Sequence, residues 1–565
     1  MRRTAAALAT ALAAGLVTTA GLHAAQAAEP EPCATPATHQ IAEVQGAGTA
    51  TPLNGQTVRV EGVVTGDFQA ADQLKGFFVQ DPTPDADPAT SDGLFVYSTT
   101  DVKVGDRVLV TGKAIEFSGL TELSPATAVD VCGTGTVKPG RVRLPLPAGT
   151  SLESYEGVLV RFQQKLTATE TYQLGRFGEV TLAAGGRLFQ PTDGHGGTQA
   201  GNDARRLLLD DASTVQNPAN VPFTSPRALR IGDTTANLTG VLSYGFNLYR
   251  LQPTGTVRFA RTNPRPERPE NVGGDVKVAS FNTLNWFTTL NERGANTAAE
   301  QERQITKLVA ALKGLNADAV GLMEVENNGD TAVGALVERL NAAVGAGTYS
   351  WVRHPNPGTD AIHVALIYKP AKLTPAGAAR SSDAPVFERP PLVQTFRRAD
   401  GKGAPVTVVI NHFKSKGCDG ATGPDADQGD GQSCFNARRV TQATAIAELA
   451  KGETNPLVLG DLNAYAAEDP IKKLTASGLT SLTERFVRPS QRYSYVFNGQ
   501  SGELDHVLAG GGLARRVSDT TIWHINSDEP LILDYNTEFN PPSLYRPDAF
   551  RSSDHDPVLV GLRLR

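Results

Sequence analysis

The strongest constraint on the fold of this 565-residue chain is a change in its sequence pattern near residue 274. Before it, residues 28–260 consist of short alternating or β-branched runs separated by Gly, Pro and Asp, a pattern typical of all-β structure. After it, apolar runs of strand length alternate with stretches of helical spacing, such as 298–315 and 436–451. The sequence therefore predicts a multidomain chain in which an all-β half precedes one layered α/β domain at 275–565.

The all-β half repeats part of its own sequence. VKVGDRVLVTG at 102–112 resembles LRIGDTTANLTG at 229–240, and a strand-like run follows each segment. We therefore predict two related β modules, at 33–135 and 140–258. The Val-Gly-Asp turn followed by a β-run and Thr-Gly resembles that of OB-fold barrels, which implies OB-like modules; a generic β-sandwich is the alternative. Residues 259–274 contain three prolines, several charges and a Gly-Gly pair, which predicts a semi-rigid linker.

The first 27 residues have the pattern of a secretory signal peptide. Arg2 and Arg3 precede a run of small and apolar residues over 5–22, and the segment closes on Ala-Gln-Ala at 25–27. We expect cleavage after Ala27, a secreted location and no membrane anchor in the mature chain.

The hydrophobic content of 40% is that of a globular protein and excludes a disordered tail.

Net charge restricts how the mature chain can meet a polyanion. Losing two arginines with the signal peptide takes the net charge from −6 to −8. An acidic chain is poorly suited to hold nucleic acid by phosphate neutralisation alone, because each phosphate contact normally uses a Lys or Arg. A metal site built from carboxylates suits it better, since divalent cations then supply positive charge toward the substrate.

The four cysteines are expected to form disulfides, because secretion places them in an oxidising compartment. Three pairings are open. The most local one joins Cys33 to Cys132 and Cys418 to Cys434, each within one predicted domain. The second bond would close a loop of 17 residues, which the chain-entropy model values at about 3 kcal/mol.

Six short segments of the α/β half each end a hydrophobic strand with a polar or acidic residue. Active sites of α/β proteins tend to lie at such strand ends. Any one segment alone is better explained as a turn cap. The segments are SFNTLNW with Asn282, GLMEVEN with Glu324, INHFKSKG with Asn411 and His412, LGDLNAY with Asp461 and Asn463, GELDHVL with Asp505, and SSDHDPV with Asp554 and His555.

In content and order, these six segments resemble the endonuclease/exonuclease/phosphatase superfamily, over about residues 275–565. The longer strings GLMEVENN, NHFKSKG, DQGDGQ and WHINSDEP look like those of secreted bacterial extracellular nucleases, which also carry an N-terminal β region, sometimes of OB type. The resemblance implies an α/β four-layer sandwich of the deoxyribonuclease type behind the N-terminal all-β (OB-like) modules. It also implies hydrolysis of phosphodiester bonds.

The resemblance further implies a metal site formed by Glu324, Asn282 and Asp554. Oxygen ligands of this kind suit a hard cation, Mg²⁺ or Mn²⁺, and suit zinc poorly. Glu326 lies two residues after Glu324, so we expect it on the same strand face, where it is an alternative ligand. Its other interpretation is a polar contact at the strand end.

The catalytic residues implied by the resemblance lie on four of the segments. Asp461 positions or deprotonates water, and Asn463 orients the phosphate. His555 corresponds to the catalytic histidine, and Asp505 to the carboxylate that fixes its tautomer and favours the imidazolium. His412 helps to protonate the leaving oxygen. Whether His555 or Asp461 is the general base stays open at this point.

Three further residues are candidates for phosphate binding. Asn411 is a supporting donor beside His412. Arg438 and Arg439 open the helix predicted at 436–451, where either contacts phosphate or caps nearby acids. The insertion between the last two cysteines contains an acidic turn, for which we weigh a structural Ca²⁺ site against a solvated turn. The turn consists of Asp425, Asp427, Gly429, Asp430 and Gly431.

Two histidines outside this set, His363 and His506, lie within strand-like runs and are expected to be packed in the protein rather than to bind a ligand.

Together these features predict a secreted, Mg²⁺-dependent, monomeric nuclease that cleaves extracellular DNA, with RNA as a further substrate. One alternative is a phosphodiesterase or phosphatase acting on lipid or small phosphate esters, which would need an apolar insertion near the site that the sequence lacks. The other is a non-catalytic DNA- or matrix-binding protein, against which the complete set of candidate catalytic residues argues.

Overall fold

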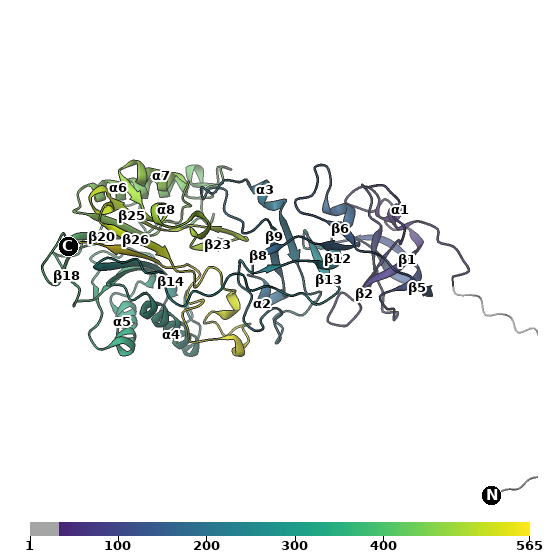
Figure 1. The fold of residues 1–565 in the computed structure, drawn as a ribbon, viewed down its shortest axis with the longest axis horizontal. Helices are drawn as coiled ribbons and strands as arrows, with labels where there is room; N and C mark the ends of the chain where they lie inside the picture. Colours follow the sequence, from purple (N-terminus) through teal and green to yellow (C-terminus); the bar gives the residue numbers. More distant parts are fainter. Residues whose placement is uncertain (1–32) are drawn as a thin grey trace, which may run out of the picture.

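Three structural units follow one another along the long axis of the molecule (Figure 1). The computed structural model describes residues 33–565, so the predicted signal peptide lies outside the described residues. A β barrel forms one end, a second β module the middle, and the α/β domain the other end. Within the described part of the chain, no helix is both long and apolar enough to cross a membrane.

The first unit is a closed barrel with the strand order β1-β2-β3-β5-β4. It closes because β1 pairs antiparallel with both β2 and β4, while β3 and β5 run parallel. Alternate side chains, such as Val58 and Val60, fill the interior together with Ile41 of helix α1 (Ile41–Gln45). The strands are β1 (Thr57–Phe68), β2 (Gly76–Gln80), β3 (Gly93–Tyr97), β4 (Asp106–Phe117) and β5 (Leu120–Thr134).

The second unit is an eight-stranded sheet with the order β11-β8-β9-β10-β13-β12-β7-β6. The repeated sequence segments coincide with the antiparallel hairpins β4–β5 and β12–β13. The resemblance between the modules is therefore confined to a hairpin, and the strands paired around it differ. The elements are β6 (Gly140–Val142), β7 (Leu159–Phe162), β8 (Leu166–Glu170), α2 (Leu174–Phe177), β9 (Val180–Ala184), α3 (Gln199–Asp203), β10 (Arg206–Leu209), β11 (Thr234–Thr235), β12 (Leu238–Gly245) and β13 (Leu248–Pro253).

The predicted linker is bonded to both of its neighbours. At its start, the Ala260 backbone pairs with Thr234 of the second module. Further on, Arg265 forms an ion pair of 2.7 Å with Glu529 of the α/β domain, and Val272 belongs to that domain's apolar core. The linker therefore lies along the interface between two units.

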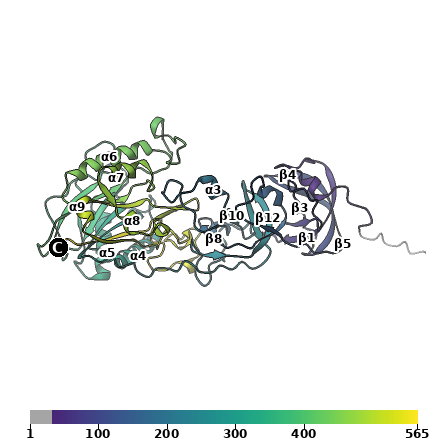
Figure 2. The ribbon, with the colours of Figure 1, turned by 45° about the horizontal axis from the view of Figure 1, so that its top comes forward.

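The α/β domain has the predicted four layers. Its two sheets have six strands each, in the orders β16-β17-β15-β14-β27-β26 and β18-β19-β20-β21-β25-β22. Apolar side chains from both sheets, including Val278 and Val408, pack together between them. Helices α4 and α5 cover the outer face of the first sheet, and α6 and α7 that of the second (Figure 2). Helix α4 begins where Thr297 and Glu300 form a capping box.

The elements of the α/β domain follow the strand–helix alternation of the sequence. The strands are β14 (Val276–Trp286), β15 (Ala319–Glu326), β16 (Ser350–Val352), β17 (Ile362–Tyr368), β18 (Leu373–Pro375), β19 (Leu392–Arg398), β20 (Val406–His412), β21 (Pro456–Asp461), β22 (Leu479–Ser481), β23 (Tyr495–Phe497), β24 (Gln500–Gly502), β25 (Asp505–Gly510), β26 (Val517–Ile522) and β27 (Val558–Leu562). The helices are α4 (Ala298–Leu315), α5 (Thr331–Val344), α6 (Asn436–Lys451), α7 (Asp469–Ala476), α8 (Leu482–Phe486) and α9 (Gly511–Ala514).

The predicted disulfide pairing is confirmed. Cys33 is bonded to Cys132 on β5, with their Cα atoms 5.6 Å apart, and this bond ties the N-terminal segment to the barrel. Cys418 is bonded to Cys434, with a Cα separation of 5.1 Å, and this bond closes the insertion that precedes α6.

Candidate active site

The candidate residues gather at one edge of the two facing sheets. β14 and β15 run parallel, as do β20 and β21, so the carboxyl ends of these four strands lie at the same edge. β25 and β27 run antiparallel to their neighbours, so their amino ends lie there too. This topology brings six segments that are far apart in sequence to one place.

Asn282, Glu324 and Asp461 are in direct contact across the two sheets. The amide nitrogen of Asn282 donates to Glu324 Oε1 at 3.1 Å and to Asp461 Oδ2 at 3.2 Å. The other Glu324 oxygen accepts the backbone N–H of Asn285 at 3.0 Å. Burial, reinforced by the charge of Asp554, raises the pKa of Glu324 to about 7. Burial also raises the pKa of Asp461, to about 6.

Two histidines face this carboxylate pair. His412 Nε2 lies 3.5 Å from Asp461 Oδ2 and 4.0 Å from Glu324 Oε1. Burial, together with the positive charges of Arg389 and His555, holds the pKa of His412 well below its usual range. Nε2 of the second histidine, His555, lies 3.8 Å from Asp461 Oδ2.

His555 and Asp505 form a closely bonded pair. His555 Nδ1 lies 2.7 Å from Asp505 Oδ2, which directs Nε2 toward Asp461. Burial opposes a charge on the imidazole, but Asp505, Asp461 and Asp554 together raise its pKa well above the usual value. The ring of Tyr495 lies 4.6 Å from that of His555. The geometry therefore favours an imidazolium held in one orientation.

The strand end at β21 is shaped by close backbone contacts. A Cβ at Gly460 would collide with the Asn411 carbonyl, so only glycine fits at this crossing. Asn463 has φ 47°, its N–H donates to Asp461 Oδ1 at 2.9 Å, and its side-chain amide donates to the Phe413 carbonyl at 3.1 Å. These bonds fix both residues of the Asp-x-Asn pair beside the two histidines.

Comparison with known proteins identifies the family. The model of the Endonuclease/Exonuclease/phosphatase family matches residues 271–555, which is half of the chain. The chain belongs to the endonuclease/exonuclease/phosphatase family. A second model, Domain of unknown function (DUF8508), matches residues 148–263 in the second β module. No curated protein matches the sequence.

Solved structures similar to the chain align with about half of it. A Danio rerio TDP2 complexed with single-strand DNA product is 13% identical, with 50% of this chain and 97% of that chain covered and a TM-score of 0.34. An AP endonuclease from Archaeoglobus fulgidus is 14% identical, with coverages of 51% and 99% and a TM-score of 0.33. An endonuclease/exonuclease/phosphatase from Bacteroides vulgatus is 15% identical, with coverages of 51% and 99% and a TM-score of 0.35.

The oxygen-rich cluster of this endonuclease/exonuclease/phosphatase domain fits a hard divalent cation. Within residues 33–565, the group of His, Cys, Asp or Glu side chains able to share one ion is Glu324, His412 and Asp461, whose ligand atoms lie within 4.8 Å of one another. Burial raises the pKa of both carboxyls, and the charge of Asp461 adds to the rise at Glu324, so a cation would stabilise their ionised forms. Asp554 is partly exposed beside them, and its charge acts on both Glu324 and His555.

Glu324 and Glu326 do not share a strand face, contrary to the prediction. The pairing of β15 with β17 shifts between Leu322 and Val325, and Glu324 has φ 62°, which identifies a β-bulge. Past the bulge, Glu326 accepts two backbone N–H groups, from Thr288 at 2.7 Å and Thr289 at 3.1 Å. Glu326 therefore makes a polar contact at the strand end, as in the second interpretation given for it from the sequence.

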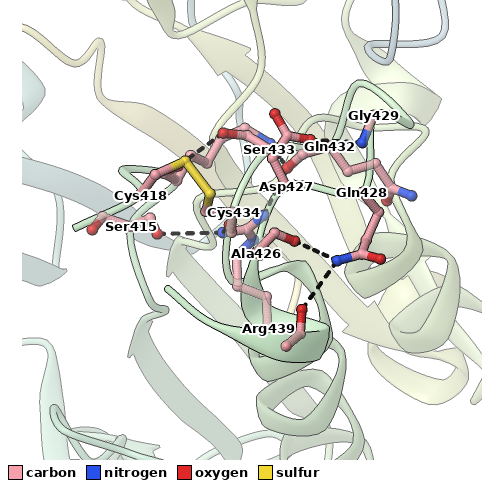
Figure 3. The surroundings of a disulfide bond; sticks show 12 residues. Ser415, Cys418, Ala426, Asp427, Gln428, Gly429, Gln432, Ser433, Cys434 and Arg439 are labelled. Carbon is pink, nitrogen blue, oxygen red and sulfur yellow. Dashed lines mark hydrogen bonds between the residues drawn. A yellow bond between two sulfur atoms is a disulfide. The ribbon is translucent and has the colours of Figure 1, made fainter. Parts of the chain in front are cut away.

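The predicted phosphate contact by Arg439 needs correction. Its guanidinium is fully buried and donates to the backbone carbonyls of Cys434 at 2.8 Å and Gln432 at 2.9 Å (Figure 3). It therefore holds the disulfide-closed insertion in place. Arg438 forms ion pairs with Glu388 at 2.6 Å and Asp425 at 3.1 Å, in agreement with its alternative role of capping acids.

Asn411 also has a structural environment. Its amide nitrogen donates to the carbonyls of Val409 at 3.0 Å and Leu459 at 3.3 Å, inside the second sheet. These bonds occupy the donor that a phosphate would need, so Asn411 supports the pairing of β20 with β21 rather than projecting into the cluster.

The acidic turn of the insertion does not gather its carboxylates around one point. Asp427 accepts the N–H of Gly429 at 2.9 Å, and Asp430 accepts that of Gln432 at 2.9 Å. Asp425 instead accepts the N–H of Arg438 at 3.1 Å. Asp427 and Asp430 thus each support a local turn and Asp425 contacts the start of α6, so the arrangement gives no support to a Ca²⁺ site.

Three residues near the site carry no motif that would have revealed them. Arg389 is buried and donates to the Phe413 carbonyl at 2.6 Å, and its charge acts on His412 and Asp461. Tyr495 packs against His555. Asn526 accepts the backbone N–H of Ser552 at 2.8 Å and donates to the His555 carbonyl at 2.6 Å, so it holds the loop that carries His555. These contacts join residues far apart in sequence.

Proposed function

We propose that the protein is a secreted, metal-dependent nuclease that hydrolyses phosphodiester bonds of extracellular DNA, with RNA as a further substrate. The observation that carries the proposal is the His555–Asp505 pair, which faces Asp461 and Glu324 across one buried cluster. Members of the endonuclease/exonuclease/phosphatase family act on such bonds, and the cluster lies inside the matched region.

Cleavage of a phosphodiester needs an oriented water, neutralisation of the non-bridging oxygens and stabilisation of the departing alkoxide. A divalent cation held by Glu324, Asn282 and Asp554 would supply the neutralisation. Asp461 is suited to orient the water and accept its proton, because its Oδ2 accepts from Asn282 and lies close to both histidines. Because Asp505 stabilises a charged imidazole at His555, that ring is suited to donate from Nε2 to a phosphate oxygen.

His412 and Asn463 complete the proposed phosphate environment. His412 Nε2 and His555 Nε2 both lie within 4 Å of the same oxygen, Asp461 Oδ2, at 3.5 Å and 3.8 Å. We propose that His412 contacts the leaving oxygen and that Asn463 orients the phosphate. With this arrangement, Asp461 is the stronger candidate for the general base, because the carboxylates around His555 favour its protonated form.

Secretion and the nature of the N-terminal units are also part of the proposal. Both disulfides lie within single units, which agrees with folding in an oxidising compartment. The five-stranded order β1-β2-β3-β5-β4 with β3 and β5 parallel supports an OB-type first module. We propose a monomer whose cleavage site lies in the α/β domain.

The test uses the mature chain, residues 28–565, on closed circular DNA, linear DNA and RNA, with Mg²⁺ or Mn²⁺ and with a chelator. We expect chelator-sensitive cleavage of DNA. Nicking of the closed circle establishes endonuclease action, whereas loss of linear DNA alone indicates exonuclease action. Sphingomyelin and a small phosphomonoester are assayed in parallel. Cleavage of either one without cleavage of nucleic acid would overturn the proposed substrate.

A matched variant links the activity to the cluster. Glu324→Ala should abolish hydrolysis while the variant melts cooperatively, as the wild type does. Asp519→Ala is the control, because Asp519 lies on the edge strand β26 and its carboxylate contacts the neighbouring Thr520 N–H. Retention of activity in Glu324→Ala would show that the cleavage takes place elsewhere.

A further inference from the structure

A hairpin of the α/β domain extends to the second β module. This hairpin consists of β23 and β24, and Figure 1 shows β23 beside the second module. Ser501 on β24 pairs with a loop of that module, because its N–H donates to the Leu188 carbonyl at 2.9 Å and its carbonyl accepts the Gln190 N–H at 2.9 Å. The loop thus extends the hairpin by one further segment.

The same loop places a carboxylate, Asp193, inside the α/β domain. The Asp193 side chain is fully buried, and its Oδ1 accepts two backbone N–H groups, from Ala466 at 3.2 Å and from Glu503 at 3.1 Å. Its Oδ2 lies 3.2 Å from Nδ1 of His195, whose ring stacks on Phe189 at 3.9 Å. Burying a carboxylate costs free energy unless its oxygens accept hydrogen bonds or pair with a cation. These contacts therefore hold the Asp193 side chain in one position.

The two backbone groups that Asp193 holds belong to the two segments that carry the catalytic acids. Ala466 lies three residues after Asn463, on the loop that leaves β21. Glu503 lies two residues before Asp505, where the chain enters β25. One oxygen of the second module therefore connects the Asp-x-Asn loop to the segment of the histidine's partner.

Neighbouring contacts hold this loop against the α/β domain independently of Asp193. The Thr192 hydroxyl donates to Glu468 at 2.8 Å, and the Thr192 carbonyl accepts the Ala467 N–H at 2.9 Å. At the other end of the loop, Arg187 forms an ion pair of 2.8 Å with Asp528. The loop is thus held against the α/β domain at Arg187 and at Thr192, and Asp193 directly follows Thr192.

We propose that Asp193 is a positioning residue for the hydrolytic site, through which the second β module completes the active centre of the α/β domain. This inference rests on the proposed function, since the residues that it positions are those of the proposed reaction. Asp461 and Asp505 are paired in the β21–β25 ladder. The Asp193 oxygen joins the two segments beyond the end of that ladder, and so holds the loop of Asn463 and the entry to β25 in fixed positions. A displacement of about 1 Å in such a group is enough to cost about 100-fold in rate.

The test compares single substitutions in the full mature chain. Asp193→Ala removes the shared acceptor, and we expect kcat to fall roughly 10- to 100-fold with KM changed less than about threefold. Asp193→Asn keeps an oxygen at the same place and should stay within about threefold of the wild type. The control is Asp203→Ala, since Asp203 is half exposed on α3 of the same module.

Hydrogen exchange supplies a readout that does not depend on activity. The Ala466 and Glu503 amides should exchange faster in Asp193→Ala than in the wild type or Asp193→Asn, without faster exchange in the barrel. If Asp193→Ala does not fold, Asp193→Ser replaces it, because its hydroxyl is too short to reach either N–H.

The outcomes test the positioning role of Asp193 and the proposed nuclease function separately. An Asp193→Ala kcat within threefold of the wild type, or an equal loss in Asp193→Asn, would overturn the positioning role. If the wild type cleaves no phosphodiester at all, the proposed function fails. In that case the exchange of the two amides alone shows whether Asp193 orders the site.

Discussion

Two histidine–carboxylate pairs lie on either side of β25, and only one of them faces the candidate active site. Asp505 and His506 are adjacent on this strand, so their side chains point to opposite faces. Asp505 bonds His555 at 2.7 Å, whereas His506 Nδ1 lies 3.3 Å from Glu503. Both imidazoles are buried, and acidic neighbours raise the pKa of each, that of His506 to about 9.

The two pairs differ in the second ring nitrogen. His506 Nε2 is hydrogen-bonded to the Ala464 carbonyl at 2.8 Å, so both nitrogens of that ring are occupied. His555 Nε2 makes no hydrogen bond with residues 33–565 and lies 3.8 Å from Asp461 Oδ2. A raised pKa and a buried partner therefore do not distinguish the proposed catalytic histidine from a structural one. What distinguishes them is the second ring nitrogen, which in His555 makes no hydrogen bond within residues 33–565.

The largest expected effect is on activity. His555→Gln keeps an amide that can donate to Asp505 but cannot hold a proton, so we expect kcat to fall by about 1,000-fold. His506→Gln should reduce kcat per folded molecule by less than about tenfold. Steady-state hydrolysis of DNA, with folded protein quantified by circular dichroism, measures both. Equal losses in the two variants would remove the distinction between the pairs.

The next effect is on stability. His506→Ala leaves Glu503 buried without its cation, and breaking a buried pair in this way costs about 3–5 kcal/mol of unfolding free energy. Urea unfolding followed by tryptophan fluorescence measures the loss. The control is Lys451→Ala, because Lys451 is exposed on α6 and pairs with the exposed Glu448. A loss below about 1 kcal/mol would mean that the pair contributes little to the fold.

The same pair predicts a pH dependence. The pKa of His506 is raised from 6.5 to about 9, so its contribution is fully present below about pH 6.5 and is lost as the pH rises toward 9. At 1.36 kcal/mol per pKa unit, the contribution is on the order of 3 kcal/mol. The pKa of Glu503 is lowered, so its own contribution is present above its usual value and is lost in acid.

The measurement compares the wild type with His506→Gln between pH 6 and pH 9.5. The difference in unfolding free energy between the two proteins should shrink as the pH rises across this range, because only the wild type loses the stabilising proton. A difference that stays constant with pH would show that His506 is not charged in the folded protein.

The sequence contained enough information to predict part of this arrangement. The ends of alternating strands lie at one edge in an α/β domain, so Asp461, Glu324 and His412 could be predicted to meet. The helices 298–315 and 436–451 have the predicted bounds, and in the first of them the apolar residues recur at helical spacing. These predictions rest on local patterns.

Other features depend on contacts between distant residues. The inward turn of Arg439 follows from backbone carbonyls of the insertion, and the placement of Asp193 follows from the docking of a separate module. Neither leaves a periodic signal in the sequence. The bulge at Glu324 is of the same kind, since regular alternation predicts one face for residues two apart.

The smallest expected effect tests that bulge. Like the two histidine pairs, the two glutamates of β15 are close in sequence but differ in what they contact. Glu326 accepts N–H groups from Thr288 and Thr289, so Glu326→Gln keeps an acceptor and should lower stability by about 1 kcal/mol. Its kcat should stay within about threefold of the wild type. Glu324→Gln, by contrast, should lose most of its activity, because the carboxylate that it removes faces Asn282 and Asp461. Thermal melts and DNA hydrolysis with titrated Mg²⁺ separate the two. If Glu326→Gln instead needed far more Mg²⁺ while Glu324→Gln did not, Glu326 would be the ligand and the bulge would not decide which glutamate binds the cation.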